Sequence, residues 1–326
     1  MAAPSRKNTR RPASKAAKTS GNPARPRVSA APPKPAPVTA RDWVGAARLR
    51  TLPLAISPIL VGTGAALVVD QRLHWVLALC CLVVAVALQI GVNFANDYSD
   101  GIRGTDDHRV GPARLTASGR VAPRAVLRAA LISFALAALV GIAVVIRTQH
   151  WWMLLVGALC IVAAWYYTGG KRPYGYSGFG ELFVFVFFGL VATLGTTFVQ
   201  IGAIPGEAWF GAVGVGLLAC GVLITNNLRD IDQDRLVGKR TLSVRIGRRA
   251  SQVLFTVVML LPFVISVLIA QLYPVAWLSL LVLLASLSAT LIVWTYRAPR
   301  ELIVALQLSS LTSVAWSAFL VWAFVA

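Results

Sequence analysis

Residues 77–100 read LALCCLVVAVALQIGVNFANDYSD, an apolar run of membrane length that ends in a cluster of Asn and Asp side chains. A second apolar run, residues 208–228, leads into a similar cluster at residues 226–234, NNLRDIDQD. With Asp106 and Asp107, which closely follow the first cluster, these stretches hold seven of the twelve acidic residues. Acidic side chains are costly at membrane depth, so where they gather they usually line a polar cavity or an ion path. The two clusters therefore point to divalent-metal and phosphate chemistry at a membrane surface.

The composition indicates an all-α, polytopic membrane protein. Of the 326 residues, 57% are hydrophobic and 13% are charged, and the mean hydropathy is +0.71, which is rare for a soluble chain of this size. Apolar windows long enough to cross a bilayer predict about nine transmembrane helices. Their expected limits are 45–69, 73–97, 126–146, 150–168, 181–203, 208–228, 250–270, 275–296 and 303–325.

Residues 1–41 differ in composition from the rest of the chain. They are rich in Pro, Ala and Ser and contain ten Lys or Arg and no acidic residue. We predict a disordered basic tail over residues 1–41 and a transmembrane domain over residues 42–326. No secretory signal is expected, because no short apolar stretch occurs near the start. Beside a membrane domain, the expected partner of the tail is anionic lipid rather than nucleic acid.

The distribution of basic residues predicts the orientation. With nine crossings, the N-terminal tail and every second loop lie on one side of the membrane. All but two of the 31 Lys and Arg residues fall on that side or in adjoining helix ends, and the exceptions are Arg72 and Arg147. The positive-inside rule therefore predicts a multi-pass protein of the plasma membrane whose N-terminus and acidic clusters face the cytoplasm.

Each polar cluster has helical spacing, since residues three or four apart share a face of a helix. Gln89 begins the first such face. The candidate metal ligands on the two faces are Asn93, Asn96, Asp97, Asp100, Asn226, Asp230 and Asp234. Mg²⁺ prefers hard oxygen ligands and is often bound by one or two carboxylates together with substrate phosphates. We therefore predict two Mg²⁺ ions bridged by a diphosphate, and we interpret Asp106, Asp107 and Asp232 as helix caps or solvated loop charges.

Basic residues near the acidic clusters suit a bound anion, although membrane topology alone would also place Arg and Lys in these loops. Segment 167–176, YTGGKRPYGY, is more specific, because it combines two cations and several aromatic residues with glycines that allow close approach of the backbone. Arg109 and Arg235 are further basic residues beside the clusters. The candidate diphosphate-binding residues are Arg103, Arg114, Lys171, Arg172, Lys239 and Arg240.

The four cysteines do not suggest a zinc site or a disulfide framework. Cys80, Cys81, Cys160 and Cys220 all lie in apolar runs, and the sequence has no CxxC or Cys/His ligand spacing. We interpret them as small buried hydrophobic residues.

These motifs resemble those of the UbiA-type family of intramembrane prenyltransferases. The paired Asp-rich motifs of the family match Asn93-x-x-Asn96-Asp97-x-x-Asp100 and Asp230-x-x-x-Asp234, and its Tyr-x-x-x-Lys element matches Tyr167 to Lys171. Many members carry a further acid where this chain has Gly101. The resemblance covers residues 42–326 and implies a helical bundle with a central cavity open to the cytoplasmic face. It implies catalytic roles for Asp97, Asp100, Asp230, Asp234, Tyr167 and Lys171.

Longer stretches are similar to the branch of the family that acts on 1,4-dihydroxy-2-naphthoate. They are Asp97-Tyr-Ser-Asp100-Gly-x-x-Gly104-Thr-Asp106, Gly111-Pro112-x-Arg114-Leu115, and Asn226-Asn-Leu-Arg-Asp230-x-x-x-Asp234-x-x-x-Gly238-Lys-Arg-Thr241-Leu. The resemblance implies an Mg²⁺-dependent enzyme of menaquinone biosynthesis. It would transfer a polyprenyl group from polyprenyl diphosphate to this acceptor, release CO₂ and diphosphate, and yield demethylmenaquinol.

Two alternatives remain at this point. A UbiA-type enzyme could use another acceptor, such as 4-hydroxybenzoate, haem or a phosphorylated sugar. A cation-coupled transporter could use the acids as ion sites, but it would place polar residues near the middle of discontinuous helices. Here the acids gather at one membrane face, which favours the transferase.

Overall fold

The computed structural model describes residues 38–105 and 114–326. These residues form helices and no strand, which confirms the all-α class. The chain divides into a segment Met1–Pro35 and a unit Ala36–Ala326, and the architecture below is that of the second unit. The predicted tail, except for residues 38–41, lies outside the described residues, as do Asp106, Asp107 and Arg109.

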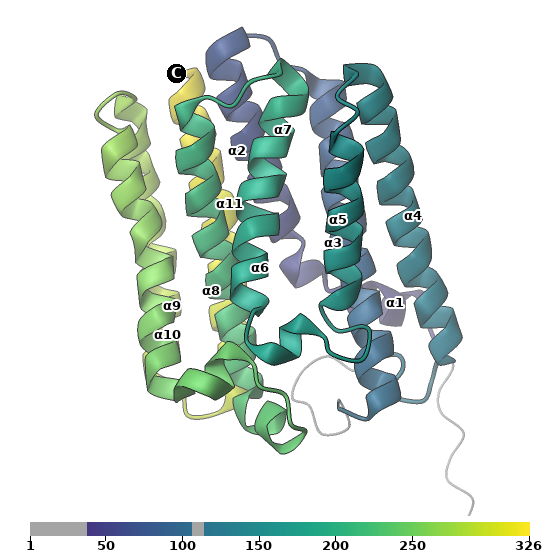
Figure 1. The fold of residues 1–326 in the computed structure, drawn as a ribbon. Helices are drawn as coiled ribbons and strands as arrows, with labels where there is room; N and C mark the ends of the chain where they lie inside the picture. Colours follow the sequence, from purple (N-terminus) through teal and green to yellow (C-terminus); the bar gives the residue numbers. More distant parts are fainter. Residues whose placement is uncertain (1–37, 106–113) are drawn as a thin grey trace, which may run out of the picture. The chain divides into compact units, whose positions relative to one another are not determined.

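The long helices lie side by side as a bundle (Figure 1). Segment η3 is a π-helix, and the other segments marked η are short 3₁₀ helices. In chain order the elements are α1 (Ala40–Ala46), η1 (Leu49–Thr51), α2 (Pro53–Asp70), α3 (Trp75–Arg103), α4 (Pro123–Thr148), α5 (Met153–Tyr166), η2 (Tyr174–Ser177), α6 (Gly180–Val184), η3 (Phe185–Val191), α7 (Ala192–Ile201), α8 (Gly206–Leu236), α9 (Leu242–Ile269), η4 (Pro274–Val282), α10 (Leu283–Thr295), η5 (Pro299–Glu301) and α11 (Leu302–Val325).

Eight helical runs among the described residues are long and apolar enough to cross a membrane. They include the continuous run α6–η3–α7, Gly180–Ile201. The ninth predicted span, 150–168, corresponds to α5, which has only 14 residues. At 1.5 Å per residue α5 is about 21 Å long, less than the ~30 Å of a hydrocarbon core. It nevertheless returns alongside α3 and α4 toward the opposite end of the bundle (Figure 1).

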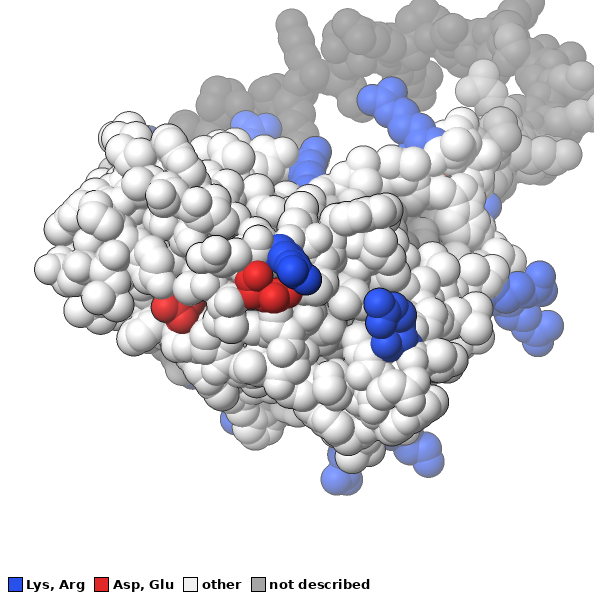
Figure 2. Space-filling model, turned by 90° about the horizontal axis from the view of Figure 1, so that it is seen from above, with Lys and Arg blue, Asp and Glu red and all other residues white. Residues whose placement is uncertain are grey.

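The two ends of the bundle differ in charge. The α2–α3, α4–α5, α7–α8 and α9–η4 loops lie at the same end as the C-terminus (Figure 1). Seen from that end, the surface carries few charged side chains (Figure 2). The polar ends of α3 and α8 lie at the opposite end, where the remaining connections are rich in Arg and Lys.

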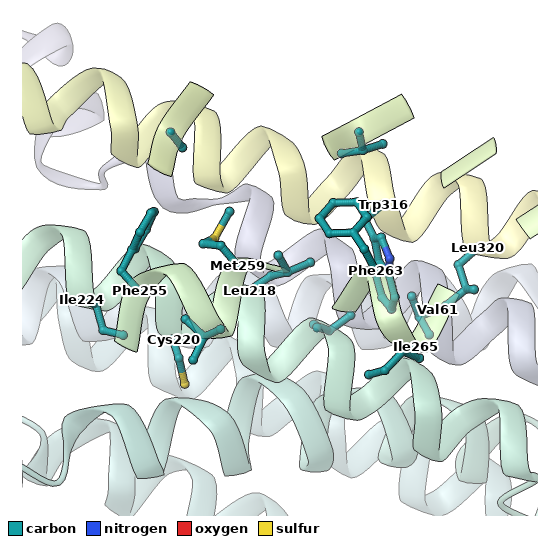
Figure 3. Packing of buried hydrophobic residues seen from close by; sticks show 14 of the residues in the cluster. Val61, Leu218, Cys220, Ile224, Phe255, Met259, Phe263, Ile265, Trp316 and Leu320 are labelled. Atoms are coloured by element: carbon teal, nitrogen blue, oxygen red, sulfur yellow. The ribbon is translucent and has the colours of Figure 1, made fainter. Parts of the chain in front are cut away.

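The core that supports α8 contains residues of α2, α8, α9, η4, α10 and α11. Val61, Leu218, Phe255, Met259 and Trp316 are buried there as members of one hydrophobic cluster (Figure 3). Lipid tails are as apolar as these side chains, so the hydrophobic effect does not drive helices together inside a membrane. Close packing of the side chains holds the helices together instead. The packed core fixes one side of α8 and leaves its other side to face α3 across a cavity.

Candidate active site

A cavity of about 550 Å³ lies between α2, α3, α5, α7 and α8. One end is lined by charged and polar side chains from the ends of α3 and α8 and from the loops that follow them. The rest is lined mainly by apolar residues, among them Val84, Ala138, Met153, Val156 and Val199. A site with a charged end and a long apolar arm fits an amphipathic ligand.

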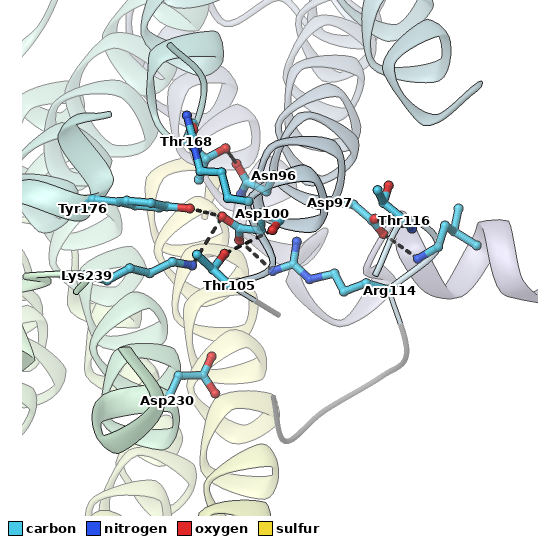
Figure 4. A network of polar contacts seen from close by, with 12 residues as sticks. Asn96, Asp97, Asp100, Thr105, Arg114, Thr116, Thr168, Tyr176, Asp230 and Lys239 are labelled. Carbon is cyan, nitrogen blue, oxygen red and sulfur yellow. Dashed lines mark hydrogen bonds and ion pairs between the residues drawn. The ribbon is translucent and has the colours of Figure 1, made fainter. Parts of the chain in front are cut away.

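Asp100, in the last turn of α3, is the centre of the polar end (Figure 4). Its Oδ1 accepts a hydrogen bond from the Tyr176 hydroxyl and lies 3.3 Å from the Lys239 Nζ. Its Oδ2 lies 3.3 Å from Arg114 Nη2. Burial, followed by the charge of Asp100, raises the pKa of Tyr176, so this phenol stays protonated and acts as a donor. Asp100 therefore joins three loops around one carboxylate.

On α8, Asn226, Asp230 and Asp234 follow one another at intervals of four residues and all line the cavity. Asp230 lies across the cavity from the Asp100 group (Figure 4). Its two carboxylate oxygens accept hydrogen bonds from Nε and Nη2 of the buried Arg229, at 2.8 and 2.7 Å. The structure thus brings the second acidic cluster to the same cavity as Asp100.

Two asparagines of α3 extend the polar wall. The Asn93 amide nitrogen donates to the main-chain oxygen of Ala47 at 2.9 Å, which leaves the amide oxygen as the atom available to a ligand. Asn96 Oδ1 accepts a hydrogen bond of 2.6 Å from the Thr168 hydroxyl. Both asparagines line the cavity, as expected from their helical spacing.

Asp97 does not share this face, contrary to the expectation from spacing. It is buried, and its two carboxylate oxygens accept hydrogen bonds of 2.9 Å from the main-chain N–H groups of Leu115 and Thr116. Figure 4 shows Asp97 directed away from the Asp100 group and toward Thr116. Asp97 is absent from the cavity lining, so its position supports a structural role, holding the 114–118 turn against α3.

Of the six predicted diphosphate-binding cations, two line the cavity and four do not. Arg114 and Lys239 line the cavity. Arg103 instead donates to the main-chain oxygens of Thr168 and Gly170 and thereby ties α3 to the glycine-rich loop. The other three are exposed and lie outside the cavity lining: Lys171, Arg172 and Arg240. Exposure follows from their position in turns that lead away from the helices.

Other cavity residues were not predicted from the sequence. Arg48, between α1 and η1, lines the cavity and has a left-handed backbone, with φ 56°. Such a conformation is uncommon for a residue other than glycine and is often found at functional sites. Nothing in the sequence distinguishes Arg48 from an ordinary arginine before a span. Tyr176 and Thr168 belong to the glycine-rich segment that the sequence did single out.

An aromatic wall continues from the polar end. Tyr174 and Phe183 are stacked with ring centroids 3.9 Å apart, and Tyr167 meets Tyr174 edge-on at 5.5 Å. Phe187, in the π-helical segment η3, extends the row at 6.0 Å from Phe183. All four rings line the cavity. Because the face of an aromatic ring is negative, such a wall can stabilise a carbocation.

The polar end has the chemistry of a magnesium site. Asp100, Asp230 and Asp234 line it together with asparagine amides, so the ligands on offer are hard oxygens. Within residues 38–105 and 114–326, no three acidic, His or Cys side chains converge closely enough to hold a metal by themselves. Mg²⁺ commonly keeps several waters and shares substrate phosphates with one or two carboxylates, which are groups that the acids at this end could supply.

Solved structures with low sequence identity share this fold. A UbiA homologue from Aeropyrum pernix matches with a TM-score of 0.65 and 16% identity, covering 83% of this chain and 97% of that one. A UbiA homologue from Archaeoglobus fulgidus, solved with GPP and Mg²⁺, matches with a TM-score of 0.60 and 13% identity, covering 86% and 99%. The bundle architecture is therefore that of the UbiA homologues.

Curated relatives are much closer in sequence. The 1,4-dihydroxy-2-naphthoate octaprenyltransferase of Mycobacterium tuberculosis is 47% identical over 276 residues, which are 85% of this chain and 94% of the relative. The protein of the same name from Escherichia coli is 41% identical over 211 residues, 63% of this chain and 68% of the relative. The model of the UbiA prenyltransferase family matches residues 55–311, which include both acidic helix ends. This chain therefore belongs to the UbiA prenyltransferase family.

Proposed function

We propose that the protein transfers a polyprenyl group from polyprenyl diphosphate to 1,4-dihydroxy-2-naphthoate. In net terms the allylic C–O bond breaks, the diphosphate leaves with its electron pair, and a C–C bond to the naphthalene ring forms. The ring loses its carboxylate as CO₂, and demethylmenaquinol results. The observation that carries this proposal is one cavity with acids from two helices at one end and an apolar arm at the other. The names of the relatives support the choice of acceptor.

The charged end would hold the diphosphate. Asp100, Asp230 and Asp234, with the amide oxygens of Asn93, Asn96 and Asn226, are the proposed ligands of two Mg²⁺ ions. When bound, Mg²⁺ supplies positive charge that stabilises the leaving diphosphate. Arg114 and Lys239 add two cations on the same wall. Both contact Asp100 in this structure, so they lie within reach of an anion bound beside it.

The remaining walls of the cavity would surround the polyprenyl chain and its reactive allylic carbon. The apolar arm accepts the polyprenyl chain, and the helix walls keep water away from the allylic centre. The rings of Tyr167, Tyr174, Phe183 and Phe187 border the space between the arm and the acids. An allylic cation formed there would face aromatic surfaces rather than water.

The protein has many membrane-spanning helices, and we propose that it lies in the plasma membrane with its acidic end toward the cytoplasm. The opposite end of the described bundle carries only two basic residues, Arg72 in the α2–α3 loop and Arg147 in the last turn of α4. The positive-inside rule assigns the basic end, and with it the mouth of the site, to the cytoplasm. Soluble 1,4-dihydroxy-2-naphthoate would enter from there, while the polyprenyl donor resides in the bilayer.

The direct test uses the purified full-length protein, Mg²⁺, radiolabelled polyprenyl diphosphate and a panel of acceptors. We expect transfer to 1,4-dihydroxy-2-naphthoate, release of CO₂, and loss of transfer in excess EDTA that added Mg²⁺ restores. If the enzyme prefers 4-hydroxybenzoate or another acceptor, the proposed acceptor is wrong, but the protein is still a prenyltransferase. Full turnover in excess EDTA would contradict the metal assignment.

A further inference from the structure

Glu181 is a buried acid to which the proposed chemistry gives no role. It is the single charged residue of the continuous run Gly180–Ile201 and is only 8% exposed. An acid within a membrane-spanning run is costly, and such residues are usually functional. The N-terminus of a helix favours negative charge, which offsets part of this cost, but that effect does not require burial.

One hydrogen bond joins the Glu181 carboxylate to α8. Its Oε1 accepts from Nδ2 of Asn227 at 2.7 Å. Its Oε2 is buried and has no hydrogen-bond partner among the side chains of the described residues. The Cys220 thiol donates to the main-chain oxygen of Glu181 at 3.2 Å, so the backbone of α6 is also held against α8.

This contact fixes the orientation of the Asn227 amide. In the structure Asn227 turns its NH₂ group toward Glu181, and a carboxylate, which only accepts hydrogen bonds, holds the amide in this orientation. The Asn227 oxygen is then the amide atom left for a ligand. Asn227 lines the cavity one helical turn before Asp230, and Tyr167 and Phe183 line the same cavity. An acceptor oxygen is thereby left for a ligand in the cavity that the acids and the aromatic rings share.

We propose that Glu181 is a positioning residue that orients Asn227 to accept a hydrogen bond from a hydroxyl group of the aromatic substrate. The inference rests on the function proposed above, because an aromatic ring that attacks the prenyl carbon must sit between the diphosphate and the apolar arm. Asn227 is among the residues that line the cavity containing that space. A hydroxyl that donates to the Asn227 oxygen would fix the ring relative to the allylic carbon.

The key variant is Glu181→Gln, which keeps the size of the side chain but can offer either an oxygen or an NH₂ group to Asn227. The amide of Asn227 can then take either orientation. We expect the KM for 1,4-dihydroxy-2-naphthoate to rise about tenfold, which is the change expected when one well-placed hydrogen bond is lost. The KM for polyprenyl diphosphate and the Mg²⁺ dependence should not change. Adding Asn227→Ala to Glu181→Gln should raise the KM no further than Asn227→Ala alone, because both remove the same contact.

The matched control is Glu207→Gln. Glu207 Oε1 accepts a hydrogen bond of 2.8 Å from the Tyr273 hydroxyl, and both residues lie outside the cavity lining. The same change of charge at this position should leave both KM values unchanged. If Glu207→Gln raises the acceptor KM as much as Glu181→Gln does, the effect is general and the proposal is wrong.

Binding without turnover gives a second measurement. The acceptor alone should raise the thermal unfolding midpoint of the wild type, and this increase should be lost in Glu181→Gln, while the increase caused by geranyl diphosphate with Mg²⁺ remains. Equal acceptor responses in both proteins, or loss of both ligand responses in the variant, would overturn the proposal. If the wild type prefers another hydroxyaromatic acceptor, the same comparison is made with that compound, so an error in the acceptor is separated from an error about Glu181.

Discussion

Asp97 and Asp100 show how residues three apart on one helix can have different functions. Asp100 faces Arg114 and Lys239 in the cavity, whereas Asp97 binds the backbone of the turn at Leu115. The turn packs closely, since a Cβ added at Gly101 would lie 2.4 Å from Thr116 Cγ2. A side chain at position 101, where many family members carry an acid, therefore does not fit without moving the turn.

We predict different effects for Asp100→Asn and Asp97→Asn. Asp100→Asn removes a cavity charge and should lower kcat roughly 100-fold or more. It should also lower the unfolding midpoint, because the buried Asp100 pairs with Arg114 and Lys239. Asp97→Asn weakens a charged acceptor of two buried N–H groups, and hydrogen bonds to charged groups contribute about 1.5–3 kcal/mol each. We expect its main effect on stability. The measurements are kcat at saturating substrate and thermal unfolding of both variants in detergent.

Asp232→Asn is the control for this pair. The Asp232 side chain is 70% exposed and forms surface ion pairs with Arg248 at 3.2 Å and Arg235 at 3.8 Å. Exposed pairs contribute little, so neither kcat nor the unfolding midpoint should change. A loss of kcat in Asp97→Asn as large as in Asp100→Asn, without a change in stability, would restore Asp97 to the catalytic group.

At the scale of the helices, hydropathy predicted the apolar segments but not the polar helix ends. The predicted limits 73–97 and 208–228 stop where apolar residues become sparse, yet α3 (Trp75–Arg103) and α8 (Gly206–Leu236) continue for further turns. Some of the polar side chains in these turns, including Asp100, Asp230 and Asp234, face a protein cavity rather than lipid. Helical spacing then correctly placed Asn226, Asp230 and Asp234 together, but it could not foresee how the 114–118 turn would engage Asp97.

The contact between η3 and α8 depends on two glycines. A Cβ added at Gly189 would lie 2.5 Å from the Cα of Gly216 and 2.8 Å from the main-chain oxygen of Ala212. These backbone atoms of α8 cannot move aside as the end of a flexible side chain can. We therefore expect Gly189→Ala to destabilise the protein by about 1–3 kcal/mol. The measurement is the thermal unfolding midpoint. Activity should also fall, because η3 carries Phe187 of the aromatic wall.

Gly195→Ala is the matched control on the same continuous run. There the nearest neighbour of an added Cβ is the mobile end of Met153, at an ordinary 3.7 Å. Replacing a helical glycine with alanine at such a site is neutral or stabilising by up to about 1 kcal/mol. Equal destabilisation by Gly189→Ala and Gly195→Ala would mean that close approach of η3 and α8 is not what the glycine provides.

At the scale of the whole molecule, the number of membrane crossings and the excess of basic residues at one end together predict on which side of the membrane each terminus lies. If α5 crosses with the eight longer runs, the N- and C-termini lie on opposite sides of the membrane. The positive-inside rule places the C-terminus outside the cytoplasm. Alkaline phosphatase fused after Ala326 should therefore be active in cells, and a fluorescent protein fused at the N-terminus should fluoresce. An inactive phosphatase fusion of a full-length, membrane-inserted protein would mean that α5 does not cross.

The two acidic helix ends come from distant parts of the chain, and they meet only because the bundle places α3 and α8 on opposite walls of one cavity. If Asp100 and Asp230 hold the same diphosphate through metal, Asp100→Asn and Asp230→Asn should each lower kcat by orders of magnitude. The double variant should lose far less than the product of the single losses, because members of one catalytic unit are not additive. The experiment compares kcat of the wild type, both single variants and the double variant at saturating Mg²⁺, with unfolding midpoints measured in parallel. Losses that simply multiply, in proteins that remain folded, would show that the two carboxylates act on separate steps, and the shared diphosphate site would have to be abandoned.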